Sequence, residues 1–499
     1  MVEDCARKLL PQSQTSAQRH GSYVSNHKLR INRAYYRAQF STRPRNPAIR
    51  TFPELSPLAS CIAAKPAPGA LGSSILRRDV KPMAESMSDA CRGKAGRKGG
   101  MSLRAALWGA VAMAAALSLP LRAGAQTTVS PYLDAHYEHD SNVFRVENSA
   151  ANVAALGDPT LADNDLKSVV GVDGTYLWSQ QKLTATLEGR RFDYDHFTEL
   201  DHNEYLAHVA FDWKLTSLFD GILDARQEQY MAPFTLGNSS QLTIDVDRKI
   251  DGKGNMNVTP EWRVEAEVYS HDLKAPLEGF PDFDEREIGT HLALLNKSVT
   301  NLSYGIALDH ISGRYENAPD VGTYNQIGAE LTADYTVSAL SKLNAALGYT
   351  KRDQNDNIPS ISGVTGAFGY TRQLTGKTSF SVNVTRAINS YVAAGGSEVD
   401  TGANVSATWQ ATYRVSVSLM GGYVHSSFVG QTIPGTVVPG AVANGRVDNS
   451  PVGQLHVNYQ ALRRLKLHAY ATKQSRSSTI DLYDYNDTIV GIEAKLSWQ

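Results

Sequence analysis

Histidine is the side chain best suited to acid–base or metal chemistry in this 499-residue chain, and eleven histidines follow residue 126. They stand at positions 136, 139, 196, 202, 208, 271, 291, 310, 425, 456 and 468. His202 and His208 are six residues apart, which is not the four-residue spacing of a helical metalloenzyme motif. All three cysteines precede residue 100, so the rest of the chain has neither a thiolate ligand nor a disulfide.

Other motifs that carry chemistry are also missing after residue 126. There is no H-E-x-x-H, Walker loop, G-x-G-x-x-G or G-x-S-x-G. The stretch 245–254, "DVDRKIDGKG", resembles a calcium loop, but Lys249 stands at a ligand position and no Glu closes the loop, which favours a polar strand. We therefore expect no enzyme, no metal and no cofactor; a Ser/His/Asp site assembled from distant strands is the remaining alternative.

The acidic stretch 281–287, "PDFDERE", allows two interpretations. It could hold divalent cations between neighbouring lipopolysaccharides, or it could be a solvated charged loop. The second interpretation is favoured, because runs of charge are usually solvated.

Alternation of apolar and polar residues runs through the chain after residue 126. In 465–472, "LKLHAYAT", Leu467 and Ala469 share one face while Lys466 and His468 share the other. A period of two residues predicts β-strands. The expected strands are 128–138, 167–178, 182–194, 204–215, 220–232, 241–258, 262–274, 285–298, 302–315, 322–337, 342–354, 360–374, 378–390, 398–410, 413–427, 446–461, 465–475 and 484–498.

The connections between these strands alternate in length. Short ones fall at 179–181, 259–261, 299–301, 375–377, 411–412 and 462–464. Longer ones fall at 139–166, 195–203, 275–284, 428–445 and 476–483. Short periplasmic turns and long outer loops are typical of outer-membrane barrels. We expect one closed, antiparallel transmembrane β-barrel of about 18 strands with a wet lumen and both termini in the periplasm.

Aromatic residues support this interpretation. The tryptophans near short turns or the C-terminus are expected to face outward at the periplasmic rim: Trp178, Trp213, Trp262, Trp409 and Trp498. Tyrosines near the other strand ends are expected in the outer girdle: Tyr137, Tyr194, Tyr230, Tyr315, Tyr391 and Tyr483. The alternative is that tyrosine is simply common in strands. The last strand resembles those recognised by the outer-membrane insertion machinery, with Gln499 after the aromatic residue.

The polar face of each strand supplies the candidate lumen residues. They are Glu188, Arg190, Asp212, Lys214, Arg263, Glu265, Glu267, Tyr269, Glu330, Asp334, Lys342, Asn344, Lys466 and His468. These side chains could guide a polar polymer, or they could bond to one another along the lumen wall, and the second role is favoured. No particular binding residue is predicted.

The first 125 residues differ from the rest. Residues 1–100 carry 18 Lys and Arg against 6 Asp and Glu, without sustained periodicity. Residues 101–125 have the basic start, apolar run and A-G-A ending of a signal peptide. We expect 1–100 to be a disordered extension from a start assigned too early, with a basic targeting or nucleic-acid-binding arm as the alternative. Residues 101–125 are then the signal and 126–499 the barrel.

Two stretches carry a family resemblance. "YEHDSNVFRV" (137–146) and "RRFDYDHFTELDHNEYLAHVAFDWKL" (190–215) resemble EpsL-type exopolysaccharide biosynthesis operon proteins, within the type 2 β-barrel porin class. The resemblance implies an outer-membrane barrel that assists assembly or export of a surface polysaccharide. The partners it implies are that polymer and other export proteins, besides outer-membrane lipid and lipopolysaccharide. It implies no catalytic residue.

The alternative function is a general diffusion porin for small hydrophilic solutes. Residues 127–499 carry 29 Lys and Arg against 44 Asp and Glu. This surplus of negative charge disfavours a strongly anionic polymer in a confined path, and nucleic acid is not an expected partner.

Overall fold

A computed structural model describes residues 126–149, 152–153, 160–234, 241–275, 284–316, 322–354, 359–391, 396–429 and 445–498. The expected extension, 1–100, and signal peptide, 101–125, lie outside the described residues. Within the described part of the chain, no helix is long and apolar enough to cross a membrane.

The described residues form 18 strands and short 3₁₀ helices, η2 (Thr198–Leu200) and η4 (Asp481–Tyr483). The strands are β1 (Gln126–Asp140), β2 (Asp163–Trp178), β3 (Gln181–Tyr194), β4 (His202–Lys214), β5 (Phe219–Met231), β6 (Ile244–Asn257), β7 (Trp262–Lys274), β8 (Glu285–Val299), β9 (Leu302–Tyr315), β10 (Thr323–Ser338), β11 (Ser341–Gln354), β12 (Ile361–Thr375), β13 (Thr378–Tyr391), β14 (Gly396–Gln410), β15 (Val415–Val429), β16 (Val447–Gln460), β17 (Leu465–Ser478) and β18 (Tyr485–Ser497).

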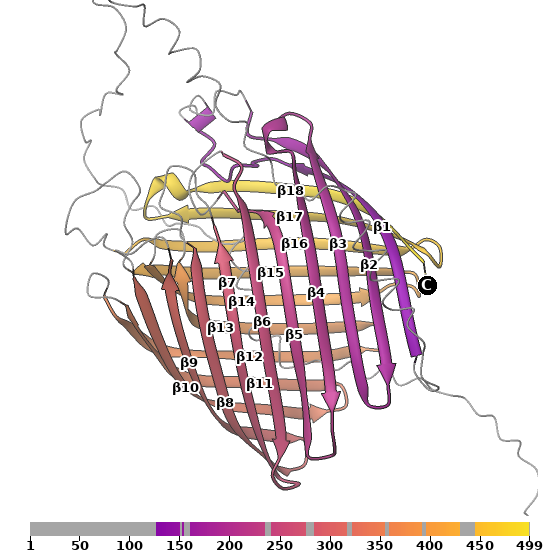
Figure 1. The fold of residues 1–499 in the computed structure, drawn as a ribbon. Coiled ribbons are helices and arrows are strands. Elements are labelled where there is room, and N and C mark those ends of the chain that lie inside the picture. Colours follow the sequence, from indigo (N-terminus) through magenta and orange to yellow (C-terminus); the bar gives the residue numbers. More distant parts are fainter. Residues whose placement is uncertain are drawn as a thin grey trace, which may run out of the picture.

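The strands close into one antiparallel ring. Each pairs with the next along the chain, and β1 also pairs with β18, where Leu133 lies opposite Leu496. Figure 1 shows β1–β9 in front and β10–β18 crossing behind them. Every strand therefore has two partners, so the sheet has no exposed edge. The predicted closed barrel of 18 strands is confirmed.

Successive residues of each strand face opposite sides of the barrel wall. In β10, Ile327 and Leu331 are more than 60 % exposed and face outward, while Glu330 and Thr332 face inward. The same alternation continues around the ring, because directly paired residues of antiparallel strands share a face. The outer face is an apolar band and the inner face is polar.

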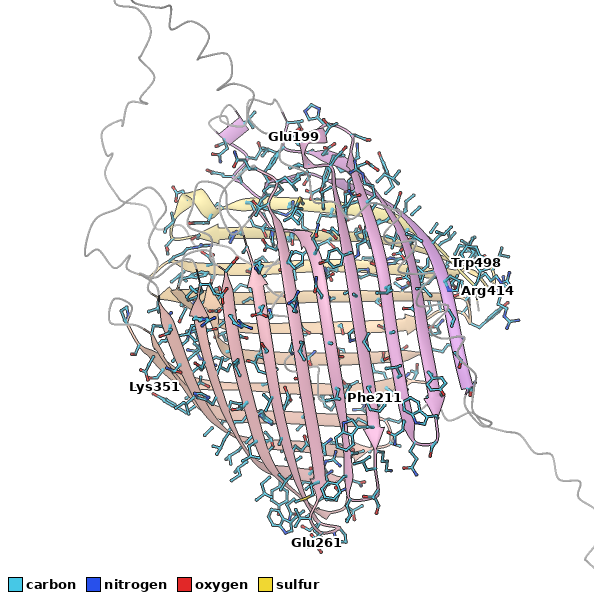
Figure 2. The ribbon with its side chains drawn as sticks, viewed as in Figure 1. Glu199, Phe211, Glu261, Lys351, Arg414 and Trp498 are labelled. Carbon is cyan, nitrogen blue, oxygen red and sulfur yellow. The ribbon has the colours of Figure 1, made fainter. Side chains whose placement is uncertain are left out.

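The two ends of the barrel differ in their connections. At one end, here called the short-turn end, even-numbered strands lead into the next strand through two to four residues, such as 179–180 and 461–464. Ser179 and Asn301 adopt positive φ in two of these turns. At the opposite, long-loop end the connections reach 141–162 and 430–446. Figure 2 labels Glu261, Arg414 and Trp498 at the short-turn end and Glu199 and Lys351 at the long-loop end.

All five predicted tryptophans lie at the short-turn end, on outward-facing positions of the register, which confirms the prediction that they share one end and face outward: Trp178, Trp213, Trp262, Trp409 and Trp498. Trp262 and Trp409 are 40 % and 53 % exposed. The described chain begins and ends at this same end, since the Trp498 N–H donates to the Pro131 carbonyl at 3.0 Å.

The tyrosine prediction is largely wrong. Tyr137 faces outward. The tyrosines on inward positions are Tyr194, Tyr230 and Tyr315. Tyr483 lies in a long-loop connection and packs on Arg446. The side chain of Tyr391 lies outside the described residues. Inward positions near the long-loop end also carry aromatic residues, so residue type alone does not indicate the face. The outward tyrosines nearer this end are Tyr137, Tyr205, Tyr349 and Tyr423.

Candidate functional site

The lumen wall is the candidate site, and every predicted lumen residue lies on an inward-facing position: Glu188, Arg190, Asp212, Lys214, Arg263, Glu265, Glu267, Tyr269, Glu330, Asp334, Lys342, Asn344, Lys466 and His468. Many of them bond to one another, as the favoured interpretation expected. The charged members lie on β3, β4, β7, β10, β11 and β17.

Arg190 is the hub of one charged network. Its guanidinium pairs with the carboxylates of Glu188 and, from neighbouring strands, of Glu204 at 3.2 Å and Glu228 at 2.9 Å. Three carboxylates share one cation here. Neighbouring strands β3, β4 and β5 are thereby tied together on the lumen side.

A second network lies nearer the short-turn end, on β5–β7. Arg263 pairs with Asp220 at 2.9 Å and with Glu265 at 3.0 Å, and the Lys253 Nζ lies 2.6 Å from Glu265. Both cations of this network are engaged by carboxylates. Sequence alternation placed Arg263 and Glu265 on one face, but it could not show that Asp220 and Lys253 reach them.

Imidazole and phenol rings form a ladder on β16, β17 and β1. His456 and His468 stack with ring centroids 5.3 Å apart, and Tyr470 stacks on His468 at 5.4 Å. His136 meets the edge of Tyr470 at 5.3 Å. The His468 Nδ1 lies 3.0 Å from Glu493. A flat, polar-edged stack of this kind suits contact with polar solutes that have an apolar face.

Four inward tyrosines share one local arrangement, which the sequence analysis missed. Each ring lies flat over a glycine of the neighbouring strand, and each hydroxyl donates to a lumen glutamate. The glycine, tyrosine and glutamate sets are Gly171, Tyr132 and Glu188; Gly289, Tyr269 and Glu287; Gly313, Tyr324 and Glu287; and Gly491, Tyr470 and Glu138. A Cβ on Gly289 would lie only 2.0 Å from the Tyr269 ring. The glycines therefore let large rings lie against the wall and leave the lumen clear.

The wall of β12–β15 has a different character. Its inward positions carry small hydroxyl, amide and aliphatic side chains, for example Thr365, Asn383, Thr385, Asn404, Ser406 and Ser418. Ser381 and Ser406 hydrogen-bond across strands at 2.7 Å, and Asn383 donates to Asn404 at 3.1 Å. In the described residues of these four strands, Glu398 and Asp400 near the long-loop end are the charged inward side chains.

The first family-like stretch builds a closed turn at the long-loop end. The Asn142 N–H donates to Asp140 at 2.8 Å, and the Asn142 amide donates to the Asn486 carbonyl at 3.1 Å on the far side of the closing seam. Arg145 pairs with Asp140 at 2.6 Å and with Asp487 at 3.4 Å. Burial lowers the pKa of the Arg145 guanidinium, but the two carboxylates outweigh burial and raise its pKa above the usual value.

The two family-like stretches also contact each other. Phe144 of the first packs edge-on against Phe197 of the second at 4.7 Å between ring centroids, and against Phe234 at 5.0 Å. Val143 and Leu200 complete this buried cluster. The motif residues therefore hold three long-loop connections together above β1–β5. Their role in the described structure is architectural.

Another cluster of charged and aromatic side chains lies at the long-loop end of β8–β13. The Arg352 guanidinium lies 3.5 Å above the Tyr324 ring and donates to Ser390 at 2.7 Å. The Tyr324 hydroxyl donates to Glu285 and Glu287, each at 2.7 Å. Charged and aromatic groups of β8, β10, β11 and β13 are thus bonded to one another at this end of the barrel.

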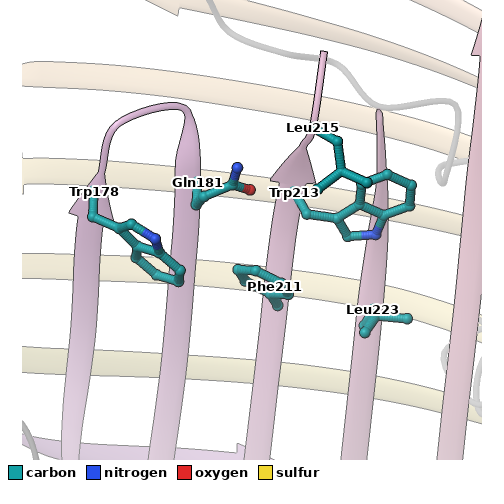
Figure 3. A pocket seen from close by; sticks show the side chains of 6 residues that line it. All are labelled: Trp178, Gln181, Phe211, Trp213, Leu215 and Leu223. Carbon is teal, nitrogen blue, oxygen red and sulfur yellow. The ribbon is translucent and has the colours of Figure 1, made fainter. Parts of the chain in front are cut away.

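The outer surface holds an apolar pocket at the short-turn end. Its volume is about 480 Å³, and Figure 3 shows it lined by Trp178, Gln181, Phe211, Trp213, Leu215 and Leu223. Trp178 and Phe211 stack there at 5.5 Å. The pocket lies on the apolar face, outside the lumen, where aromatic rings suit the boundary between hydrocarbon and headgroups. Among the described side chains, no group of three or more His, Cys, Asp and Glu is arranged to hold a metal ion.

Comparison with known proteins gives a likeness at the level of fold. No family model and no curated protein matches the chain, so the resemblance to EpsL-type proteins gains no support. Among solved structures, OpdK of Pseudomonas aeruginosa with vanillate is 11% identical with TM-score 0.41, covering 74% of this chain and 99% of that one. OccK2 of P. aeruginosa with glucuronate is 10% identical, TM-score 0.42, covering 75% and 99%.

The channel DcaP of Acinetobacter baumannii is 12% identical with TM-score 0.37, covering 76% of this chain and 99% of that one. Identities and TM-scores this low carry no argument about solutes.

Proposed function

We propose that this chain forms a water-filled outer-membrane channel through which small hydrophilic solutes diffuse. The observation that carries the proposal is the division of the closed wall into an apolar outer face and a polar inner face. A sheet can span hydrocarbon only when closure pairs all of its backbone groups. A ring of 18 strands is wide enough to leave an aqueous lumen.

The flat tyrosines support passage rather than closure. Tyr132 and Tyr269 would obstruct the lumen if they projected into it, but each lies over a glycine. The ion pairs of Arg190 and Arg263 likewise run along the wall between neighbouring strands. The side chains of the charged wall thus satisfy one another while leaving space for water.

The orientation we propose places the short-turn end in the periplasm. Short periplasmic turns and longer outer loops are the general pattern of such barrels. Both ends of the described barrel chain would then be periplasmic, and the tryptophans would lie at the inner interface among lipid headgroups. Lipid and lipopolysaccharide would contact the apolar band.

A second candidate is a path or assembly platform for a secreted polysaccharide, with other export proteins as partners. The wall of β12–β15, which has few charges, favours it, because hydroxyl and amide groups such as those of Thr385, Asn404 and Ser406 can exchange hydrogen bonds with sugar hydroxyls. This wall suits small sugars equally well, so the simpler diffusion role has priority.

Reconstitution of the purified outer-membrane protein in planar bilayers tests the channel. We expect stepwise ionic conductance, and swelling of proteoliposomes in solutions of small sugars. A folded, inserted protein without conductance would contradict the proposal.

Gene deletion separates the two candidates. A diffusion channel predicts slower uptake of small hydrophilic solutes with unchanged surface polysaccharide. Reduced surface polysaccharide, with intracellular precursor synthesis continuing, would favour the export role instead.

A further inference from the structure

The lumen charge is distributed unequally around the ring. Strands β13–β15 lie across the ring from β4–β6 (Figure 1). In the described part of β12–β15 no Lys or Arg occupies an inward position, and the inward charges there, Glu398 and Asp400, are negative. This side of the lumen therefore offers no fixed positive charge to a permeating anion.

On the charged wall, three inward cations of β5–β7 pair with neighbouring carboxylates. Arg226 pairs with Glu228, Lys253 with Glu265 at 2.6 Å, and Arg263 with Asp220 at 2.9 Å. These residues occupy β5–β7, across the ring from β14–β16. The fixed positive charge of this wall is thus largely neutralised within the wall.

Asp251 lies in the middle of this wall and has a different environment. It is 3 % exposed, and its carboxyl group shares a hydrogen bond with the side chain of Glu267 on β7. Its cross-strand neighbour on β5 is Asp224, which is bonded to the His208 Nε2 at 2.7 Å. Glu267 on β7 adds a further negative charge close to Asp251.

The nearest lysines on β6 do not form an ion pair with Asp251. Lys249 and Lys253 occupy the inward positions on either side of it. The Lys249 Nζ lies 5.2 Å from the centre of the Tyr269 ring, and Lys253 is held by Glu265. The proton that Asp251 and Glu267 share leaves one negative charge on the pair, and together with Asp224 this charge attracts cations from the solution in the lumen.

We propose that the channel passes cations in preference to anions, and that Asp224, Asp251 and Glu267 form the acidic stretch of the lumen that sets this preference. The inference rests on the proposed channel function. A ring or stretch of carboxylates raises the local concentration of cations and excludes anions, which is the general basis of charge selectivity in pores. Small cationic and neutral hydrophilic solutes are the class that fits.

Reversal potentials across a KCl gradient in planar bilayers test the inference on the full protein. We expect a reversal potential displaced toward the potassium equilibrium potential. The displacement should be larger at about 0.1 M than at 1 M salt, because the screening length falls from roughly 10 Å to roughly 3 Å.

Charge-neutralising variants test which residues cause the preference for cations. The double variant Asp251→Asn, Glu267→Gln should move the reversal potential toward zero. The matched control is Asp272→Asn on β7, which removes a charge from an outward position where Asp272 pairs with Arg286 at 3.0 Å, and it should leave the potential unchanged. A second, independent variant, Asn383→Lys, adds a cation to the wall of β12–β15, which has no inward Lys or Arg among its described residues, and should also move the potential toward zero.

Each outcome is decisive. Conductance with a zero or anion-directed reversal potential overturns the cation preference while leaving the channel intact. A preference that persists in the double variant overturns the assignment to the acidic stretch. A folded protein that conducts nothing overturns the proposed function itself.

Discussion

The strongest test of the two-faced wall uses neighbouring residues of β11. Leu347 stands at the middle of this strand, faces outward and is 64 % exposed; Ala346 precedes it and faces inward between Thr332 and Ala367. Leu347→Arg would place a guanidinium at the centre of the apolar band. Ala346→Arg would place the same group in the wet lumen at the same depth.

The magnitude follows from burial of charge in hydrocarbon. An arginine on the lipid face of a barrel costs about 2–4 kcal/mol at the bilayer midplane. Because each 1.4 kcal/mol corresponds to a factor of ten, Leu347→Arg should lower the folding equilibrium constant roughly 30- to 700-fold. Ala346→Arg keeps its charge hydrated and should change the free energy of unfolding by less than about 1 kcal/mol.

Equilibrium unfolding by guanidinium in lipid vesicles measures both variants, with tryptophan fluorescence as the signal. The interfacial tryptophans, such as Trp262 and Trp409, leave the lipid boundary when the barrel unfolds. Equal destabilisation by the two variants would refute the assignment of faces. A larger loss for Ala346→Arg would mean that the register is shifted by one residue, since a one-residue slip exchanges the two faces.

Three further predictions concern the lumen, the long-loop end and the N-terminus. Gly289→Ala should force the Tyr269 ring off the wall and lower single-channel conductance, whereas Gly363→Ala, which meets nothing within 4 Å, should not; equal conductance would contradict the packing argument. Arg145→Ala should lower the free energy of unfolding by about 3–5 kcal/mol, measured by denaturant titration, because it leaves two poorly exposed carboxylates uncompensated. Mass spectrometry of the outer-membrane form should place the mature N-terminus at Gln126, and recovery of residues 1–100 in that form would contradict the expected processing.

The strands and their faces followed from the sequence because both depend on local alternation. Leu467 and His468 are neighbours with opposite character, and the structure places them on opposite faces. The alternation of short and long connections likewise predicted which strand ends lie at the same end of the barrel. Trp178 and Trp409 lie beside short connections, so their common end was predicted too. A period of two residues is a property of the strand itself, so no partner is needed to read it.

Partners across strands could not be read in this way. Nothing in the sequence around Tyr470 indicates Gly491 beneath it, and nothing around Asn142 indicates the Asn486 carbonyl across the closing seam. Their places near strand ends predict Tyr194 and Tyr315 in the outer girdle, but both face inward among charged and aromatic neighbours near the long-loop end. Local residue type was a poor guide there, because both faces carry aromatic rings.

The charge pattern of the lumen shows the same division between local and long-range information. The sequence showed that residues 127–499 have an excess of acids and that Glu265 and Glu267 share a face. Only the closed ring places the wall of β12–β15, which has few charges, across from the charged wall and brings Asp251 next to Asp224 and Glu267. Which residues lie opposite one another depends on the register of every strand pair and on closure between β1 and β18, and these are properties of the whole ring rather than of any single strand.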